Sequence, residues 1–127
     1  MVSHSPFVLL CLLLVACSKP TPELALQYAT VLPVPRVVAR FNLINQNNSV
    51  FTNTDLQGRW TILFSGFTYC PDICPLTLGQ LQAAEQQMTM DKQHQVIFVS
   101  VVPQRDTPQS LQQYVHWFQP DWIGLTG

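Results

Sequence analysis

Apolar and polar residues change their spacing along the chain in a way that predicts strands alternating with helices. Residues 59–66 and 96–102 are two nearly continuous apolar runs, as expected of strands buried at the centre of a sheet. Between them, four apolar residues recur at helical spacing: Leu78, Leu81, Ala84 and Met88. The polar residues of the same stretch are predicted to turn outward: Gln82, Glu85, Gln86 and Gln87. This order predicts a βαβ unit and a mostly parallel sheet.

Weaker patterns extend this α/β fold at both ends. Loose alternation over residues 37–51, broken at 45–48, predicts a short hairpin at the edge of the sheet. The segment Asp106, Thr107 and Pro108 predicts the start of a second helix, with an oxygen-bearing cap and proline at the first position. The apolar face of that helix is Leu111, Tyr114, Val115 and Phe118. A third strand begins near residue 123, and the predicted sheet is C-terminally incomplete, with its core open on one side.

The N-terminal segment predicts export. Residues 7–16 form an apolar run that is shorter than the roughly 20 residues a membrane-spanning helix needs, and it ends directly before Cys17. This ending resembles a bacterial lipoprotein box. We therefore predict a signal peptide (residues 1–16), a lipidated Cys17 with a proline-containing tether (17–35), and a domain (36–127) that faces the periplasm or exterior of the cell envelope. An uncleaved hydrophobic anchor is the alternative.

Composition limits the classes of partner. The 127 residues, 47% hydrophobic and 10% charged, fit one small globular domain. Six Lys and Arg against seven Asp and Glu, without a basic run, disfavour nucleic acid as a partner. Because Cys11 leaves with the signal peptide and Cys17 is lipidated, Cys70 and Cys74 are the thiols predicted to remain in the mature protein.

Cys70 and Cys74 directly follow a predicted strand, where open α/β sheets place their reactive sites. Two geometries are open. Both cysteines lie on one face of a helix, or the helix opens at Pro75 with Cys70 in the preceding turn. In either case the sulfurs come within reach of one ion or of each other, and free amide groups at a helix start stabilise a thiolate. Thiolates favour Cu(I), or zinc if further ligands join.

A structural disulfide between these cysteines is the alternative to a reactive site. Closing so short a loop removes little chain entropy, so such a bond would stabilise the fold poorly. The flanking prolines and the expected exposure at a strand end favour a reactive site.

Three segments resemble, in the same order, motifs of the Sco/SenC family of copper chaperones: GFTYCPDICP (residues 66–75), PQRDTP (103–108) and GLTG (124–127). The resemblance implies a membrane-anchored, thioredoxin-like domain that binds copper and helps assemble the binuclear copper centre of cytochrome c oxidase. It implies Cys70 and Cys74 as thiolate ligands, with the copper-bearing oxidase subunit, other copper chaperones and thiol reductants as partners. The third ligand of the family is a histidine on a loop beyond residue 127. The resemblance thus predicts Cu(I), and Cu(II) only with such a later histidine.

Other candidate ligands are disfavoured by position. His94 and His116 are expected about 20 Å and 14 Å along the two helices from their starts, too far to ligate with the thiols. Met88 and Met90 are predicted to be structural, and Trp60, Trp117 and Trp122 to be packing or surface aromatics.

Two further positions bear on the thiol site. Val102 stands where the family typically has an aspartate, which puts the tuning of a metal site in question. Arg105 and Asp106 are read either as a loop ion pair with helix capping or as functional residues.

Three functions follow from these observations. The leading hypothesis is a metallochaperone, not an enzyme, that delivers copper to the oxidase or reduces its cysteines. The second is a thiol–disulfide oxidoreductase of the cell envelope, with Cys70 and Cys74 as the redox pair. The third is a non-functional, truncated remnant.

Overall fold

In the computed structural model, a five-stranded mixed sheet with strand order β2-β1-β5-β4-β3 organises the domain. β3 (Trp60–Gly66) and β5 (Ile123–Thr126) each pair in parallel with β4 (His94–Ser100). β1 (Asn42–Asn45) pairs antiparallel with β5 and with β2 (Val50–Thr52), and the short 3-10 helix η1 (Asn53–Leu56) follows β2. The predicted α/β class and the hairpin at the sheet edge are confirmed.

The structure describes residues 27–88 and 93–127. The chain divides into two compact units, Met1–Arg36 and Val37–Gly127. Residues 27–36 of the first unit are exposed and form no helix or strand. The predicted signal peptide, Cys11, Cys17 and Met90 lie outside the described residues. Within the described ranges, no helix has the length and apolar character that crossing a membrane requires.

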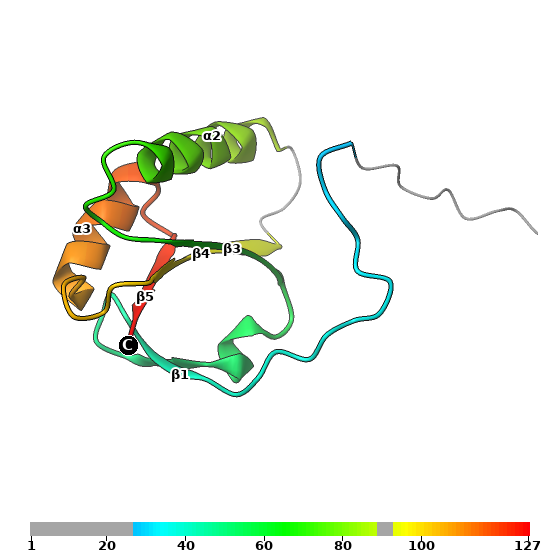
Figure 1. The fold of residues 1–127 in the computed structure, drawn as a ribbon, viewed down its shortest axis with the longest axis horizontal. Coiled ribbons are helices and arrows are strands. Elements are labelled where there is room, and N and C mark those ends of the chain that lie inside the picture. The colour runs from blue at the N-terminus through cyan, green and yellow to red at the C-terminus, as the bar shows by residue number, and fades with distance from the viewer. Residues whose placement is uncertain (1–26, 89–92) are drawn as a thin grey trace, which may run out of the picture. The chain divides into compact units, whose positions relative to one another are not determined.

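Two helices connect the parallel strands. α2 (Ile73–Gln87) joins β3 to β4, and α3 (Pro108–Phe118) joins β4 to β5. Both helices pack against the same face of β4, because Val96 and Phe98 contact residues of α2 and of α3. Figure 1 shows α2 on one side of β3 and β4 and β1 on the other. α3 begins as predicted, with Pro108 in its first turn and the Thr107 hydroxyl accepting the Ser110 N–H at 3.2 Å.

β4 forms the centre of the core because its alternate side chains are buried on both faces. Val96 and Phe98 pack against the helices, whereas Ile97 faces the hairpin side. The buried partners of Val96 and Phe98 are Leu78, Leu111, Val115 and Trp122. The partners of Ile97 are Phe51 and Leu125.

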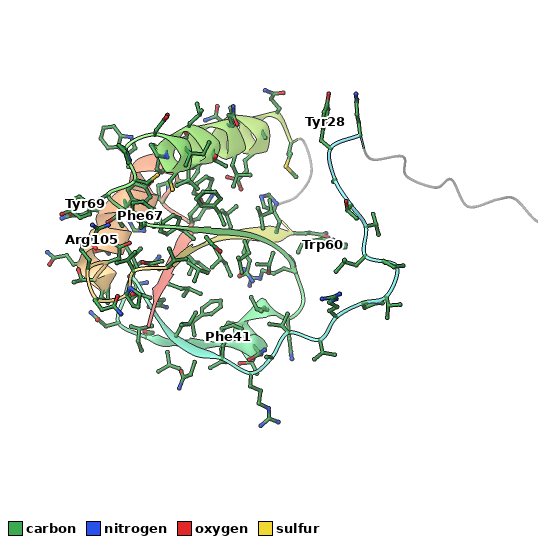
Figure 2. All side chains as sticks on the ribbon, in the orientation of Figure 1. Tyr28, Phe41, Trp60, Phe67, Tyr69 and Arg105 are labelled. Atoms are coloured by element: carbon green, nitrogen blue, oxygen red, sulfur yellow. The ribbon has the colours of Figure 1, made fainter. Side chains whose placement is uncertain are left out.

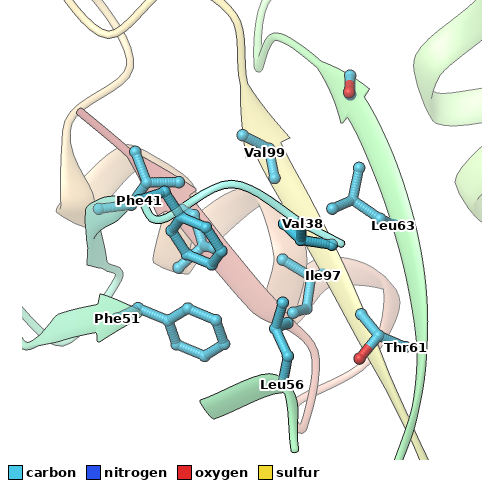
Figure 3. A pocket seen from close by; sticks show the side chains of 11 residues that line it. Val38, Phe41, Phe51, Leu56, Thr61, Leu63, Ile97 and Val99 are labelled. Carbon is cyan, nitrogen blue, oxygen red and sulfur yellow. The ribbon is translucent and has the colours of Figure 1, made fainter. Parts of the chain in front are cut away.

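The hairpin side of the sheet contains an apolar cavity of about 400 Å³. Figure 3 shows Phe41, Phe51, Leu63 and Ile97 among the side chains that line it. Leu63 is 59% exposed. This face is therefore incompletely covered by the described residues.

Two details of the prediction are wrong. β4 ends at Ser100, not at Val102. The Val101 N–H makes the last bond across to β3, to the Gly66 carbonyl at 2.9 Å, but the Val102 N–H bonds the Ser100 hydroxyl at 3.1 Å instead of a neighbouring strand. On α2, Gln82 and Glu85 turn inward, whereas Ala84 and Met88 are exposed.

The inward polar residues have partners from distant segments. The Gln82 amide donates to the Phe118 carbonyl, and Glu85 bonds His94 and Trp122. These bonds offset the cost of burying polar groups, so helical periodicity alone mispredicts this face.

Candidate functional site

The connection from β3 to α2 carries both thiols. β3 ends at Gly66, and the Cys70 N–H donates to the Phe67 carbonyl at 3.2 Å, which closes a turn over residues 67–70. α2 begins at Ile73, so Cys74 lies in its first turn and Cys70 lies in the turn before it. Pro75 also lies in the first turn, where its missing N–H removes no intrahelical bond. Of the two predicted geometries, the one with Cys70 ahead of the helix is correct, although the helix opens two residues before Pro75.

The two cysteines are free thiols, and they contact each other. The Cys74 N–H points to the Cys70 sulfur, at 3.4 Å between nitrogen and Sγ. Both residues are buried, with Cys70 9% and Cys74 4% exposed. The expected exposure at the strand end is therefore wrong, because the turn and the first turn of α2 pack the thiols against the end of β3.

The environments of the two sulfurs shift their acidities in opposite directions. Hydrogen bonds from the Cys74 thiol, then from the Cys74 and Asp72 backbone N–H groups, lower the pKa of Cys70. Burial raises the pKa of Cys74, and its bond to the Cys70 sulfur raises it further. Cys70 is thus the sulfur that ionises first, at the positive end of α2.

Gly66 makes room for the Cys74 sulfur. A Cβ atom at this position would lie 3.1 Å from Cys74 Sγ and 3.0 Å from ring carbons of Phe64 and Phe98. Because these contacts are tighter than ordinary van der Waals separation, a side chain here would displace the thiol or the rings. Because Gly66 has no side chain, the Cys74 sulfur can pack directly against the end of β3.

Tyr114 on α3 brings a phenol close to the thiols. Its hydroxyl is buried and has no hydrogen-bond partner among the described residues. Burial, together with the charges of Cys74, Cys70 and Asp106, raises the pKa of Tyr114 to about 12. Its ring packs on Phe98 at 5.3 Å between centroids, the same ring that borders Gly66. Helical periodicity assigned Tyr114 to the core, and nothing in that pattern indicated its approach to the thiols.

Asp106 and Arg105 lie behind the turn 67–70. Asp106 is fully buried and accepts hydrogen bonds from Thr68 and Ser100. The Arg105 guanidinium lies over the rings of Tyr69 and Phe67. Thr107, not Asp106, caps α3, so the predicted capping role of Asp106 is wrong. The 3.9 Å approach between Arg105 Nε and Asp106 Oδ1 agrees with the predicted ion pair. Sequence reasoning missed Thr68 and Ser100, although Thr68 stands inside the thiol motif.

The other candidate ligands lie elsewhere. His94 Nε2 is 2.6 Å from Glu85 Oε1, at the far end of α2, and His116 is exposed in the last turn of α3. Met88 is 47% exposed at the end of α2, so the core packing predicted for it is wrong. Trp122 is buried, and Trp60 and Trp117 are exposed.

The donor set therefore consists of two sulfurs. Among residues 27–88 and 93–127, no group of three or more His, Cys, Asp or Glu side chains comes together to hold a metal ion. Two adjacent thiols at a helix start, one of them acidified, fit a soft ion of low coordination number such as Cu(I).

Comparisons with known proteins agree with this site. The sequence profile of the SCO1/SenC family matches residues 30–127. A candidate copper-binding protein of Stutzerimonas stutzeri is 39% identical over 126 residues. The crystal structure of Arabidopsis thaliana ScoI with copper bound superposes with a TM-score of 0.66 at 44% identity. BsSco, described as a member of the Sco family of cytochrome c oxidase assembly proteins with a disulfide switch, superposes with a TM-score of 0.57 at 28% identity.

The matches cover most of this chain but only part of each relative. The chain is covered to 93% by the Stutzerimonas protein, 70% by the Arabidopsis structure and 71% by BsSco. It spans 62%, 56% and 55% of their respective lengths. Within the shared part, the predicted thioredoxin-like architecture is confirmed.

Proposed function

Because this chain belongs to the SCO1/SenC family, we propose that Cys70 and Cys74 bind Cu(I) as paired thiolates and deliver it to the copper-bearing subunit of cytochrome c oxidase. The observation that carries the proposal is the sulfur pair itself, with the Cys70 Sγ 3.4 Å from the Cys74 backbone nitrogen at the start of α2. The copper-bound Arabidopsis ScoI and the oxidase-assembly role named for the BsSco family support the metal and the process.

The opposite pKa shifts define an order of events. Cys70 presents a thiolate to the incoming ion, and Cys74 releases its proton as its sulfur becomes the second ligand. On delivery, ligands of the recipient displace the two sulfurs one after the other, and the thiols regain their protons from solvent. Copper remains Cu(I) throughout. Two soft thiolate ligands favour Cu(I).

The N-terminal sequence supports a place of delivery outside the cytoplasm. We propose that residues 1–16 direct export, that lipid on Cys17 anchors the protein, and that residues 17–35 tether the domain 36–127 outside the cytoplasm. An anchored chaperone would meet a membrane-embedded recipient on the same surface, which raises the effective concentration of the two partners. Other copper chaperones or thiol reductants would load or reduce the pair there.

The test is a Cu(I) titration of the reduced full chain in competition with a chromophoric Cu(I) chelator. Cys70→Ser and Cys74→Ser should each abolish tight binding, because one sulfur alone leaves Cu(I) exposed to the chelator. In the unprocessed chain, which still carries Cys11 and an unmodified Cys17, the variants Cys11→Ser and Cys17→Ser are matched controls: each removes a thiol outside the pair and should retain tight binding. Unchanged affinity in both Cys70→Ser and Cys74→Ser would overturn the proposal, and absence of binding in the parent chain would favour a remnant.

A second function, thiol–disulfide exchange, is favoured by the acidified Cys70. In this scheme the Cys70 thiolate attacks a partner disulfide, which forms a mixed disulfide and releases one partner thiolate. Cys74 then loses its proton and attacks the Cys70 sulfur, which forms the 70–74 disulfide and releases the second partner thiolate. Two electrons pass from the pair to the partner. Fast reduction of a partner disulfide by a chain that does not bind Cu(I) tightly would favour this function.

A further inference from the structure

The buried carboxylate of Asp106 accepts two hydrogen bonds from Thr68, in the turn that leads to Cys70, and one from Ser100 at the end of β4. Asp106 is 0% exposed. Its Oδ1 accepts the Thr68 hydroxyl at 2.7 Å, and its Oδ2 accepts the Thr68 backbone N–H at 3.0 Å. The Ser100 hydroxyl donates to the same Oδ2 at 2.8 Å. These charge-assisted bonds offset the cost of burying a carboxylate, and they join residues 38 positions apart in the sequence.

Thr68 is the residue through which Asp106 can act on the thiols. It stands in the turn 67–70, whose closing bond runs from the Cys70 N–H to the Phe67 carbonyl at 3.2 Å. Fixing both the backbone and the hydroxyl of Thr68 therefore fixes the direction in which the chain enters Cys70.

The same turn is held from its outer side by the neighbouring residue. The Arg105 guanidinium carbon lies 4.8 Å from the centroid of the Tyr69 ring and 5.7 Å from that of Phe67. Figure 2 shows these three side chains together at one edge of the domain. Arg105 is half exposed and Tyr69 is 69% exposed, so this cation–π contact is expected to contribute less than the buried bonds of Asp106.

We propose that Asp106 is a positioning residue for the thiol pair, and that it acts through Thr68 to hold the Cys70 sulfur over the first turn of α2. The expected effect on Cu(I) affinity rests on the proposed function, whereas the expected effect on the position and reactivity of the thiols does not. The Cys70 sulfur accepts the Cys74 N–H at 3.4 Å, and a shift of the turn by a few tenths of an ångström would weaken that bond. In a looser turn, the distance between the two sulfur atoms would also vary over a wider range than a single Cu(I) ion can bridge.

The geometry argues against a role confined to α3. The first turn of that helix is capped by Thr107, and the donors to the Asp106 carboxylate, on Thr68 and Ser100, lie outside α3. The carboxylate instead joins the turn that follows β3 to the last residue of β4. It thereby connects the two strand ends that border the thiols.

Thr68→Val is the variant that separates positioning from folding. Valine keeps the shape of threonine and the backbone bond to Asp106 but removes the hydroxyl donor. Thr61→Val is the matched control, because the Thr61 hydroxyl also makes a bond, accepting the Gln95 amide at 2.9 Å, but on β3 away from the turn. Thr68→Ser restores the hydroxyl. Three quantities are measured on the reduced full chain: the alkylation rate of Cys70 near neutral pH by peptide mapping, the Cu(I) affinity, and the free energy of unfolding.

We expect Thr68→Val to slow Cys70 alkylation and weaken Cu(I) affinity, each by about threefold to tenfold, as loss of one hydrogen bond predicts. Thr68→Ser should return both values toward those of the parent. Thr61→Val should lower stability without changing either. The proposal is overturned if Thr68→Val loses stability as Thr61→Val does while its alkylation rate and affinity stay at the parent values. Failure of the parent chain to bind Cu(I) would instead overturn the proposed function, and the alkylation rates would still test Asp106.

Discussion

The two ends of the β3–β4 pair differ in how completely their polar atoms are bonded. At the glutamate end, defined by Glu85, His94 and Trp122, the carboxylate uses both oxygens: Oε1 lies 2.6 Å from His94 Nε2, and Oε2 accepts the Trp122 indole N–H at 2.7 Å. At the thiol end, defined by Cys70, Cys74 and Tyr114, the contact to the Cys70 sulfur is 3.4 Å long and the Tyr114 hydroxyl is unbonded.

The difference separates atoms that stabilise the fold from atoms kept for chemistry. A carboxylate with both oxygens occupied is committed to the structure, because releasing it would leave buried donors unpaired. Sulfur is a weak hydrogen-bond acceptor, so the Cys70 sulfur can exchange its thiol and N–H donors for a metal ion at little cost. The thiol end still has a fully bonded carboxylate, Asp106, but it lies behind the sulfurs rather than among them.

The largest effect is expected at Glu85, where a substitution tests whether the glutamate end serves stability and not copper binding. Glu85→Ala removes the acceptor for the buried indole of Trp122 and for His94, and should lower the free energy of unfolding by about 2 to 4 kcal/mol. Cu(I) affinity should be unchanged, because the thiols lie at the other end of α2. Urea unfolding followed by circular dichroism, with a parallel copper titration, measures both.

Gln86→Ala is the matched control for Glu85, since Gln86 is exposed on the same helix and should change stability by less than about 0.5 kcal/mol. A fall in Cu(I) affinity that tracks the stability loss of Glu85→Ala would show that the two ends are coupled.

Acid should lower the free energy of unfolding through Asp106 at the thiol end, by less than the Glu85 substitution does. Burial alone would raise the pKa of Asp106, but hydrogen bonds from the side chain and backbone of Thr68 and from Ser100 lower it below the ordinary 3.8. A folded-state pKa below the unfolded value gives stability that is complete above about pH 4 and is lost as the pH falls through the folded value.

The corresponding variant is Asp106→Asn. It should be less stable than the parent by about 1 to 3 kcal/mol at pH 7 and pH 5 alike, and the difference should shrink below about pH 4. Asp72→Asn, at an exposed position without a side-chain cap bond, is the control and should change stability at pH 7 by less than about 0.5 kcal/mol. A difference between Asp106→Asn and the parent that stays constant into strong acid would contradict this assignment.

The smallest expected effect tests the unbonded hydroxyl. Tyr114→Phe removes a buried polar atom that has no partner in the described structure, so the reduced chain should be unchanged or more stable, by less than about 1 kcal/mol. Thermal unfolding of the reduced chain measures this. Tyr69→Phe, at an exposed position, is the control. A loss larger than 1 kcal/mol in Tyr114→Phe would mean that the hydroxyl is bonded after all.

Local patterns predicted the elements, and they located the thiols. The apolar run of β3, the cap and proline of α3 and the position of Cys70 after a strand are each readable within a few residues. The inward turn of Glu85 was not predicted, because its partners are 9 and 37 residues away. Thr68 and Asp106, 38 residues apart, were missed as a pair for the same reason. Burial of the thiols depends on how segments pack, which spacing does not encode.

Gly66 limits how this site could be transferred to another protein. Copying Cys70 and Cys74 with their turn onto the end of a strand in a different α/β scaffold would fail if the recipient's last strand residue carried a side chain, since even a methyl group would meet the Cys74 sulfur at 3.1 Å. The smallest transplantable unit therefore begins at the glycine, four residues before Cys70. An engineer who grafts only the two cysteines would leave out the space that one of them occupies.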